Sequence, residues 1–372
     1  MNKFHEFSGL NALQQKSFKP VRVMMTKIAV VLFSSILFLS CTNQEPGPDV
    51  SNIKVDLILR RFDSEFFSLD TNNVKTELYR LQKAYPDFLP LYINHVLGLG
   101  PLQDSNQLAF TGTKKFLTLN KRIYDTAKTV PGSLDDFKKQ MTEGFRYLKY
   151  DYPQYKIPEI IATIGPMDAL APMSNQTLTT NYMGVNFIAV SLQFYLGKDF
   201  AIYNDPGYAS SVAPQYRSKR FSKEYMTADV FSLVIDDMYP DSSNRLPLIE
   251  RFVEKGKRLQ LLSNFLPGMN DTLLTGYTGA QTKWCTENER SIFNFFTTNN
   301  LLYERDPALT QPFTSEGPFT QSMGEQSPGN IGAFVGWQIV KAYLKKKGNI
   351  RPDELMKTPA KIIFEASSYK PR

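Results

Sequence analysis

The sequence predicts an α+β fold that is predominantly α-helical and contains a small β-sheet. Apolar residues recur at helical spacing along most of the chain, which indicates helices with one buried face. Two segments in the middle, 157–164 and 185–195, are instead rich in β-branched and aromatic residues, which is typical of buried strands. Residues 327–347 are apolar almost all round, so we expect them to form one buried helix around which the other helices pack.

The chain has 372 residues, of which 42% are hydrophobic, and this length allows one large domain or two ordinary ones. Its formal net charge of +7 is concentrated at the N-terminus, where residues 1–40 hold five basic side chains and one acidic one. The remainder of the chain is close to balanced. Nucleic acid is therefore not an expected partner, because the basic surface that would bind it is missing.

The N-terminus has the form of a secretory signal. Lys27 supplies a positive start, and an apolar run over 28–39 and the small residue Ser40 precede Cys41. The apolar run is too short to span a bilayer. A cysteine directly after the small residue resembles the bacterial lipoprotein signal, in which this cysteine receives lipid and becomes the new N-terminus. The alternative is an ordinary signal peptide with an incidental cysteine at this position.

Three segments follow from this interpretation. Residues 1–40 are the leader and signal peptide, 41–50 are the lipidated cysteine with a short flexible tether, and 51–372 are a single domain. Residues 1–23 are interpreted as an upstream extension from a wrongly assigned start codon, because Met24 is well placed to begin a signal peptide.

Resemblance to other lipoproteins also suggests the location. Thr42 stands where an aspartate would retain a lipoprotein in the inner membrane, so the outer membrane is the expected destination. Surface lipoproteins of Bacteroidota usually carry an acidic cluster after the anchor, and its absence favours the periplasmic face. If Cys41 carries lipid, Cys285 has no partner for an intramolecular disulfide, and we interpret it as a buried structural thiol rather than a nucleophile.

The N-terminal part of the domain is predicted to contain one strand and several helices. Apolar residues alternate with mostly polar ones over 53–60, which indicates a strand. Helical spacing then predicts the segments 64–69, 74–81, 86–96 and 106–128, the last of them broken at Gly112. Ser133 is expected to cap an amphipathic helix that follows it.

The two predicted strands are joined by a polar loop over 169–182, and a second long connection covers 199–217. Ordered loops of this length are often functional or lid-like, although composition alone decides nothing here. Helices are predicted for 222–238 and 246–265. Thr278 and Gln281 form a capping box for a further helix, which runs to Phe296. A proline-containing loop then leads to the central helix, and two short helices begin at Pro352 and Pro359.

The central helix has recognisable ends and one unusual face. Asn330 is expected to be its N-cap, and Gly348 to close its C-terminal turn. Gly332 and Gly336 lie four residues apart on one face, where they allow another element to approach the backbone closely. We expect close packing there, because each glycine lowers helix propensity by about 1 kcal/mol relative to alanine.

The sequence offers little catalytic chemistry. His95 is the only histidine beyond the leader, so an H-E-x-x-H motif, a His/Cys metal cluster and a Ser-His-Asp triad that needs a second imidazole are all excluded. Gly-rich phosphate loops are also missing. We interpret His95 as a surface or hydrogen-bonded core residue, and we assign no catalytic residue, no metal ligand and no cofactor.

Pairs of carboxylates leave one alternative open. Such pairs occur on predicted helices at Asp236 and Asp237, Glu250 and Glu254, and Glu287 and Glu289. Charges in this pattern ordinarily belong to a solvent-exposed helix face. A hydrolase that acts through carboxylates without a metal remains the competing hypothesis, and it requires Asp236, Asp237, Glu250 and Glu254 to converge on one concave pocket.

Several distinctive sequence blocks occur along the chain: the leader, RRFD, VSLQFYLGKDF, YTGAQTKWCTENERSIFNFFTTNNLLY, GPFT, SPGNIGAFVGWQIVKAYL and the closing SYKP. Taken together, these blocks resemble GldB, a family of gliding motility lipoproteins of Bacteroidota. The resemblance covers nearly all of the chain after the signal and is most specific over 277–344. It implies an outer-membrane-associated lipoprotein that is required for gliding and is linked to type IX secretion, with no defined biochemical activity.

That family is in turn similar to predicted zinc peptidases, which implies a zincin-like helical body. Those proteins have an H-E-x-x-H helix, then a helix with a Glu-Gly pair, and later a helix like Gly332–Val340. Here the first helix would be 222–238, which holds no histidine, and the Glu-Gly position is occupied by Lys255 and Gly256. The resemblance thus implies that the fold persisted while the metal site was lost, as in a pseudoenzyme.

Two functions follow as hypotheses. The first is a non-catalytic, lipid-anchored scaffold or chaperone whose partners are envelope proteins of the gliding or secretion machinery. The second is the metal-independent hydrolase of peptides or peptidoglycan, with a groove covered by residues 199–217. The arrangement of the four carboxylates distinguishes them.

Overall fold

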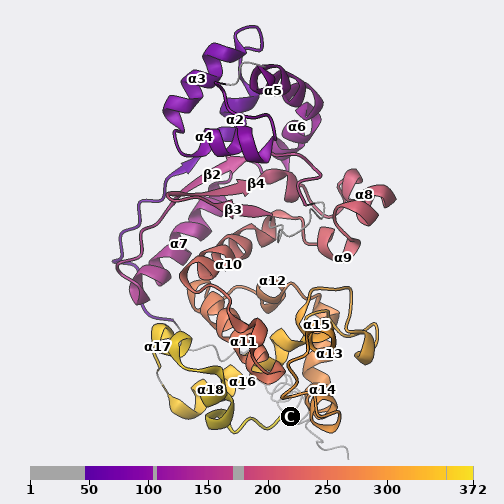
Figure 1. The fold of residues 1–372 in the computed structure, drawn as a ribbon. Coiled ribbons are helices and arrows are strands. Elements are labelled where there is room, and N and C mark those ends of the chain that lie inside the picture. Colours follow the sequence, from indigo (N-terminus) through magenta and orange to yellow (C-terminus); the bar gives the residue numbers. More distant parts are fainter. Residues whose placement is uncertain (1–46, 104–106, 171–179, 349, 372) are drawn as a thin grey trace, which may run out of the picture. The chain divides into compact units, whose positions relative to one another are not determined.

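The computed structural model describes residues 47–103, 107–170, 180–348 and 350–371. The leader and Cys41 lie outside the described residues. Residues Gly47–Arg372 form one compact unit, and its fold is the predominantly helical α+β fold that the sequence predicts (Figure 1).

A four-stranded sheet lies in the N-terminal half. Its strands follow the order β1-β2-β4-β3, in which β1, β2 and β4 run parallel and β3 is antiparallel to β4. The bounds are β1 (Leu59–Arg60), β2 (Glu159–Thr163), β3 (Asn181–Met183) and β4 (Phe187–Ser191). The two central strands confirm the two predicted in the middle of the chain. The strand predicted over 53–60 is present only at its last two residues, as β1, and β3 was not predicted.

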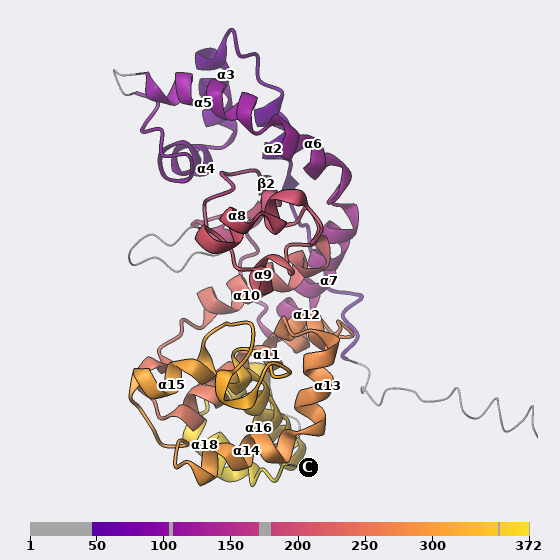
Figure 2. The same ribbon diagram turned by 90° about the vertical axis from the view of Figure 1, so that its right-hand side faces the viewer.

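The two faces of the sheet are covered by different helices. Ile161 and Ala189 face a cluster rich in aromatic side chains, which belongs to the helices between β1 and α6. Ile160 and Val190 face the opposite way, into a core shared with α7 and α10. Figures 1 and 2 show these two helical layers on either side of the strands. This alternation is the normal consequence of strand geometry, since successive side chains point to opposite faces.

The N-terminal helices are α2 (Phe62–Phe67), α3 (Val74–Ala84), α4 (Phe88–Leu91), the π-helix η1 (Tyr92–Val96), α5 (Leu108–Leu119), α6 (Lys121–Thr129) and α7 (Asp135–Asp151). Gly112 does not break the helical segment as predicted: it lies inside α5, where a Cβ atom would overlap the Leu99 side chain. The break comes at Asn120 instead. Ser133 is also not the N-cap of α7, because Leu134 takes that position with a positive φ of 66°.

The connection at 199–217 is a set of short helical turns rather than an irregular loop. It contains η3 (Ala201–Asn204), α8 (Pro206–Ser211) and α9 (Gln215–Ser218). Asp205 caps α8 by accepting a hydrogen bond from the Tyr208 backbone N–H at 2.9 Å. Tyr203 in this segment is completely buried, so the connection is part of the core.

The regular elements among the described residues of the C-terminal half are all helices. Its elements are η4 (Lys223–Tyr225), α10 (Met226–Met238), η5 (Ser243–Arg245), α11 (Leu248–Phe265), α12 (Asp271–Thr275), α13 (Gly279–Glu287), α14 (Glu289–Thr298), α15 (Pro307–Thr314), η6 (Gln321–Met323), α16 (Ile331–Lys347), α17 (Pro352–Lys357) and α18 (Ala360–Ser367). The capping box of Thr278 and Gln281 is confirmed. The helix predicted to reach Phe296 is divided at Asn288, and α15 was not predicted.

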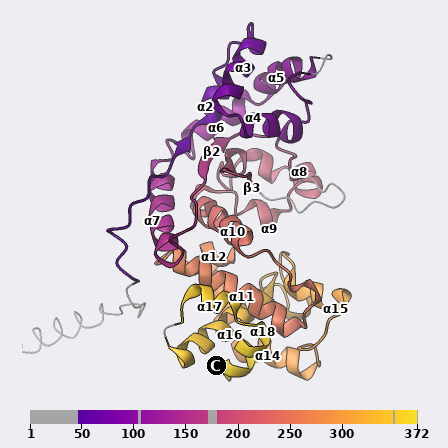
Figure 3. The same cartoon turned by 60° about the vertical axis from the view of Figure 1, so that its left-hand side comes forward.

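Helix α16 is the predicted central helix, and α11, α14, α15 and α18 pack against it (Figure 3). Gly348 ends it with a φ of 82°, as expected. Asn330 occupies the N-cap position but has a positive φ of 54° and makes no side-chain capping bond, so the predicted cap chemistry is wrong.

The glycines of α16 account for its contact with α11. A Cβ atom at Gly336 would overlap the carbonyl group of Phe252, and one at Gly332 would overlap the Phe252 ring. Gly256 of α11 meets Gly336 in the same way, backbone against backbone. The close packing predicted for this face is therefore confirmed, and α11 and α16 together form a rigid pair.

Candidate functional site

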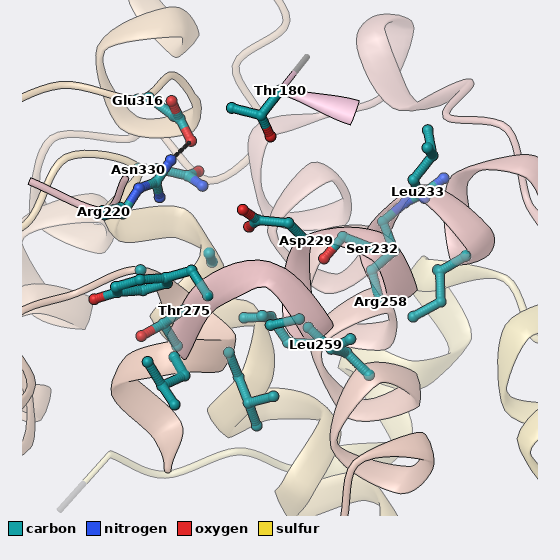
Figure 4. Close-up of a pocket in the computed structure, with 18 of the residues that line it drawn as sticks. Thr180, Arg220, Asp229, Ser232, Leu233, Arg258, Leu259, Thr275, Glu316 and Asn330 are labelled. Atoms are coloured by element: carbon teal, nitrogen blue, oxygen red, sulfur yellow. Dashed lines mark hydrogen bonds and ion pairs between the residues drawn. The ribbon is translucent and has the colours of Figure 1, made fainter. Parts of the chain in front are cut away.

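A cavity of about 350 Å³ lies between helices α10, α11 and α12 and the N-terminal end of α16. Figure 4 shows Asp229 near its middle, with Arg220, Glu316 and Asn330 on one side and Leu233 and Arg258 on the other. Its volume falls in the range of small-molecule sites. Its walls are partly charged and partly apolar.

Helices α10 and α11 each present one face to the cavity. On α10 the face consists of Asp229, Ser232, Leu233 and Asp236, and on α11 of Lys255, Arg258, Leu259 and Leu262. The spacing within both sets is that of one helical face, which repeats every three or four residues. The opposite face of α10 is apolar and buried in the core beneath the sheet. Burial of that face fixes the direction in which the charged face points.

An ion pair closes one end of the cavity. The Arg220 guanidinium donates to Glu316 Oε1 at 2.8 Å, and the Glu316 side chain remains 50% exposed. Partial burial would raise the pKa of Glu316, but Arg220 outweighs it and holds the pKa below its ordinary value. Gly276, with a φ of 72°, lies directly under Arg220, and any side chain there would displace the guanidinium. The backbone of this turn thus positions the arginine.

Asp229 is the most perturbed carboxyl group of the cavity. Burial raises its pKa from 3.8 to about 6, although Arg220 and a hydrogen bond from Tyr195 act in the opposite direction. The Tyr195 hydroxyl donates to Asp229 Oδ2 at 2.9 Å and itself accepts from the Asn181 amide at 2.7 Å. These contacts connect the cavity to strand β3 and to the turn after β4.

The cations of the α11 face differ in their surroundings. The Arg258 guanidinium donates to Asp236 at 2.5 Å and also to the Tyr239 carbonyl. The Lys255 ammonium makes no hydrogen bond or ion pair with any residue that the structure describes. Burial lowers the pKa of Lys255, and the more distant Asp241 only partly opposes this shift. Lys255 is therefore a desolvated charge that lacks a direct partner in this part of the chain.

The remaining wall is apolar and comes from three helices: Leu259 and Leu262 of α11, Leu273 and Leu274 of α12, and Ala333 of α16. Asn330 stands at the edge of this wall, and its side-chain Oδ1 is buried without a hydrogen-bond partner among the described residues. The cavity thus combines an aliphatic surface with polar groups that are not all satisfied.

The four carboxylates required by the hydrolase hypothesis do not converge. Asp236 lines the cavity, whereas Asp237 is exposed beside it on α10 and is not part of the wall. Glu254 pairs with the buried Lys257 at 2.8 Å and faces a different depression near α17. Glu250 lines neither of these sites. The arrangement is that of separate helix faces.

The other residues considered from the sequence have structural surroundings. His95 is exposed at the end of η1, with its ring 3.3 Å from the Asn94 amide. Cys285 is completely buried, and burial raises the pKa of its thiol to about 12, which confirms the structural interpretation. Glu289 accepts a hydrogen bond from Tyr369 at 2.7 Å. In the described parts of the chain, no three His, Cys, Asp or Glu residues gather as a metal site would require.

Comparison with known families matches residues 43–371 to the family described as gliding motility protein GldB. The match covers most of the chain, including every element around the cavity. The chain belongs to the GldB family. Membership in this family implies a role in gliding motility. Because the family consists of lipoproteins, it also places this GldB-family protein among the lipid-anchored proteins of the cell envelope.

The other comparisons add no relative. No curated protein and no solved structure matches the chain. Among the helices that the structure describes, none has the length and apolar character of a membrane span. The similarity to zinc peptidases remains a prediction, as does lipidation of Cys41, which lies outside the described residues.

Sequence reasoning missed two residues of the cavity, Asp229 and Lys255, as candidate functional groups. A signal was present for Asp229, because Ala228, Val230 and Phe231 surround it with apolar residues on a helix that had to be buried. Burying a carboxyl group among apolar residues is unfavourable, so such a position indicates that a cavity or a polar partner lies beside the group. Lys255 was noted from the sequence only as the residue at the Glu-Gly position of the zinc peptidases, and its place in the cavity depends on the contact between α11 and α16.

Proposed function

We propose that this GldB-family protein is a non-catalytic scaffold or chaperone of the cell envelope that supports gliding and type IX protein secretion. In this proposal, lipid on Cys41 holds the protein at the periplasmic face of the outer membrane, where it binds other envelope proteins of the gliding or secretion machinery. Family membership supports the gliding role, the leader sequence supports the lipid anchor, and the arrangement of the carboxylates supports a non-catalytic role.

The carboxylates on α10 and α11 carry the proposal. Each one near the cavity is already engaged: Asp236 with Arg258, Glu316 with Arg220, and Asp229 with Tyr195. A carboxylate hydrolase needs two such groups around one reacting bond, one to donate a proton and one to attack or to activate water. Carboxylates that are each held by a different partner, Arg258, Arg220 or Tyr195, favour a structural and binding role.

Complementation tests this proposal directly. In a gliding strain that lacks its own copy of the gene, a combined Asp236→Asn, Asp237→Asn and Glu250→Gln variant should restore colony spreading and type IX secretion to wild-type levels. A Cys41→Ala variant should be exported but released from membranes, and it should fail to restore spreading. Loss of spreading in the triple variant, at normal protein abundance, would identify a catalytic carboxylate and refute the scaffold proposal.

A second measurement addresses the partner. Affinity purification of the lipidated protein from cross-linked envelopes should recover other envelope proteins in stoichiometric amounts, and the Cys41→Ala variant serves as the matched control because only its location changes. Recovery of the protein alone from both preparations would contradict a scaffold. A change in peptidoglycan composition in the deletion strain that the triple variant fails to reverse would favour the hydrolase instead.

A further inference from the structure

Lys255 is the feature of the cavity that the scaffold proposal does not account for. Lys255 lines the cavity and is half-buried, and its ammonium has no hydrogen bond or ion pair within the described residues. A desolvated cation without a partner is unfavourable, and proteins usually pair such a group or leave it exposed. Its position therefore calls for a functional reason, independent of the partner that the protein binds in the envelope.

The other charges of the cavity are already matched. Arg220 pairs with Glu316, and Arg258 pairs with Asp236. Arg217 also has interactions of its own. The Asp229 carboxyl group accepts a hydrogen bond from the Tyr195 hydroxyl. Because its pKa is raised to about 6, only part of the Asp229 population is ionised near pH 6 and can neutralise a nearby cation. One positive charge among the described residues of the cavity, that of Lys255, is left without a counter-charge in direct contact.

The walls next to this charge are aliphatic. Leu259 and Leu262 lie one and two turns along α11 from Lys255, and Leu273 and Leu274 of α12 also line the cavity. A ligand that fills the cavity would bury an apolar body against these leucines and place a negative group at the ammonium. Burial of apolar area contributes about 25 cal/mol per Å², and the charge contact orients the ligand.

The number of uncompensated charges distinguishes a carboxylate from a phosphate. Phosphate sites combine several free donors, commonly backbone N–H groups at a helix N-terminus or a guanidinium fork. Here Arg220 and Arg258 are committed to carboxylates, and among the described lining residues Lys255 offers the free point charge. A single ammonium matches a single negative charge.

We propose that the cavity between α10, α11 and α12 binds a small organic carboxylate with a branched aliphatic body, whose carboxylate contacts the Lys255 ammonium. Two sources have this chemistry: a free aliphatic acid, and the C-terminal residue of a peptide with an aliphatic side chain. Both place a monoanion beside an apolar group of the size that the cavity encloses, about 350 Å³.

Titration calorimetry with the purified protein tests the proposal, using two acids and their uncharged isosteres. The probes are 4-methylpentanoate with 4-methylpentanamide, and N-acetyl-leucine with N-acetyl-leucine amide. We expect at least one acid to bind about tenfold or more tightly than its amide, because a charge-assisted hydrogen bond is lost in the amide. The pair that shows the difference identifies the source as a free acid or as a peptide terminus.

Two variants locate the site. Lys255→Met keeps the length of the side chain but removes the charge, so it should weaken acid binding about tenfold or more and leave amide binding unchanged. Lys345→Gln is the matched control, because Lys345 is exposed in the last turn of α16 and should not affect binding. Thermal melting should show that Lys255→Met is folded and at least as stable as the wild type, since it removes a desolvated charge.

Three results would overturn the proposal. The first is equal affinity for the acids and the amides, and the second is an absence of acid binding at millimolar concentration. The third is acid binding that Lys255→Met leaves intact. If Lys255→Met failed to fold, Lys255→Gln would replace it, because glutamine also removes the charge but keeps a polar end. The affinity of this variant for the acids should fall in the same way. Unchanged affinity would again overturn the proposal.

Discussion

The two faces of helix α11 differ in almost every physical respect. On one face, Gly256 and Phe252 meet the backbone of α16 so closely that no additional atom fits. On the other, Lys255 and Arg258 border a cavity of about 350 Å³ with charges that are partly desolvated. Neighbouring residues of one helix therefore have opposite roles, and the packed face holds the charged face in place.

This difference separates stability from binding. The packed face contains no side chain that could recognise a ligand, and its interactions are backbone contacts and ring packing. The ion pairs of the cavity face add little to stability, because pairs with half-exposed carboxylates stabilise proteins weakly. Substitutions on the first face should act mainly on folding, and those on the second mainly on binding and on the pH dependence of stability.

The largest expected effect comes from Gly336→Ala. The new methyl group would overlap the Phe252 carbonyl, which is backbone and cannot rotate away, so α11 and α16 must separate. We expect a loss of about 3 kcal/mol or more in the free energy of unfolding, at the upper end of the range for overpacking. Urea denaturation followed by circular dichroism measures this loss.

Gly279→Ala is the matched control for that substitution. Gly279 lies in the first turn of α13, is exposed, and has open space where a Cβ atom would be added. Alanine there should leave stability unchanged or raise it by up to about 1 kcal/mol through helix propensity. Equal effects of the two alanines would show that the α11–α16 contact is not close packed.

An intermediate effect is expected from Asp229→Asn on the cavity side. The folded-state pKa of Asp229 is raised from 3.8 to about 6, so its contribution to stability is fully present below about pH 4 and is lost as the pH rises through 6. This loss amounts to at most about 3 kcal/mol. Asparagine can still accept from Tyr195 and carries no charge, so the variant should be the more stable protein at pH 7 and should lose less stability between pH 4 and pH 7.

The pH profile of the wild type includes another group with the same sign. Burial and the nearby Asp353 raise the pKa of Asp151 to about 6, so Asp229→Asn should flatten the profile only in part. The double variant with Asp151→Asn should flatten it further. A wild-type slope that survives in Asp229→Asn without any reduction would place the perturbed carboxyl group elsewhere.

The smallest effect is expected from Glu316→Gln, which removes the ion pair at the end of the cavity. The Glu316 side chain is 50% exposed, and pairs of this kind contribute about 0.2 to 1 kcal/mol. The loss should shrink further at high salt, because exposed charges are screened. A loss of more than about 2 kcal/mol at neutral pH, beyond the range of exposed pairs, would mean that the cavity face supports the fold as strongly as the packed face does.

Sequence reasoning predicted the packed face well and the cavity face poorly. Gly332 and Gly336 predicted a close contact, because two glycines at helical spacing in a buried helix lower its propensity without benefit unless another backbone approaches them. The identity of the partner, α11, could not be derived from spacing, since it depends on how helices far apart in the chain meet. The capping box at Thr278 was predictable because it depends on residues three positions apart.

The errors arose where tertiary contacts override local preference. Gly112 looked like a helix break, but it lies within α5 because Leu99 fills the space beside it. Ser133 and Asn330 have good capping chemistry, yet Ser133 precedes the N-cap Leu134 and only accepts a long 3.4 Å bond from the Asp135 N–H, and Asn330 makes no side-chain capping bond. The short strand β3 and the turns after β4 depend on partners across the sheet. The charged lining of the cavity combines residues from α10, α11 and the loop that carries Glu316, which no local pattern brings together.

The backbone contact between α11 and α16 also has an evolutionary consequence. Position 256 accepts only glycine, because any larger residue would separate the two helices. Position 255 is one residue away but lines the cavity, where its side chain meets no backbone of α16. Changes at 255 can therefore alter what the cavity accepts while the contact between α11 and α16 is preserved, so one scaffold can diverge in specificity by point substitution.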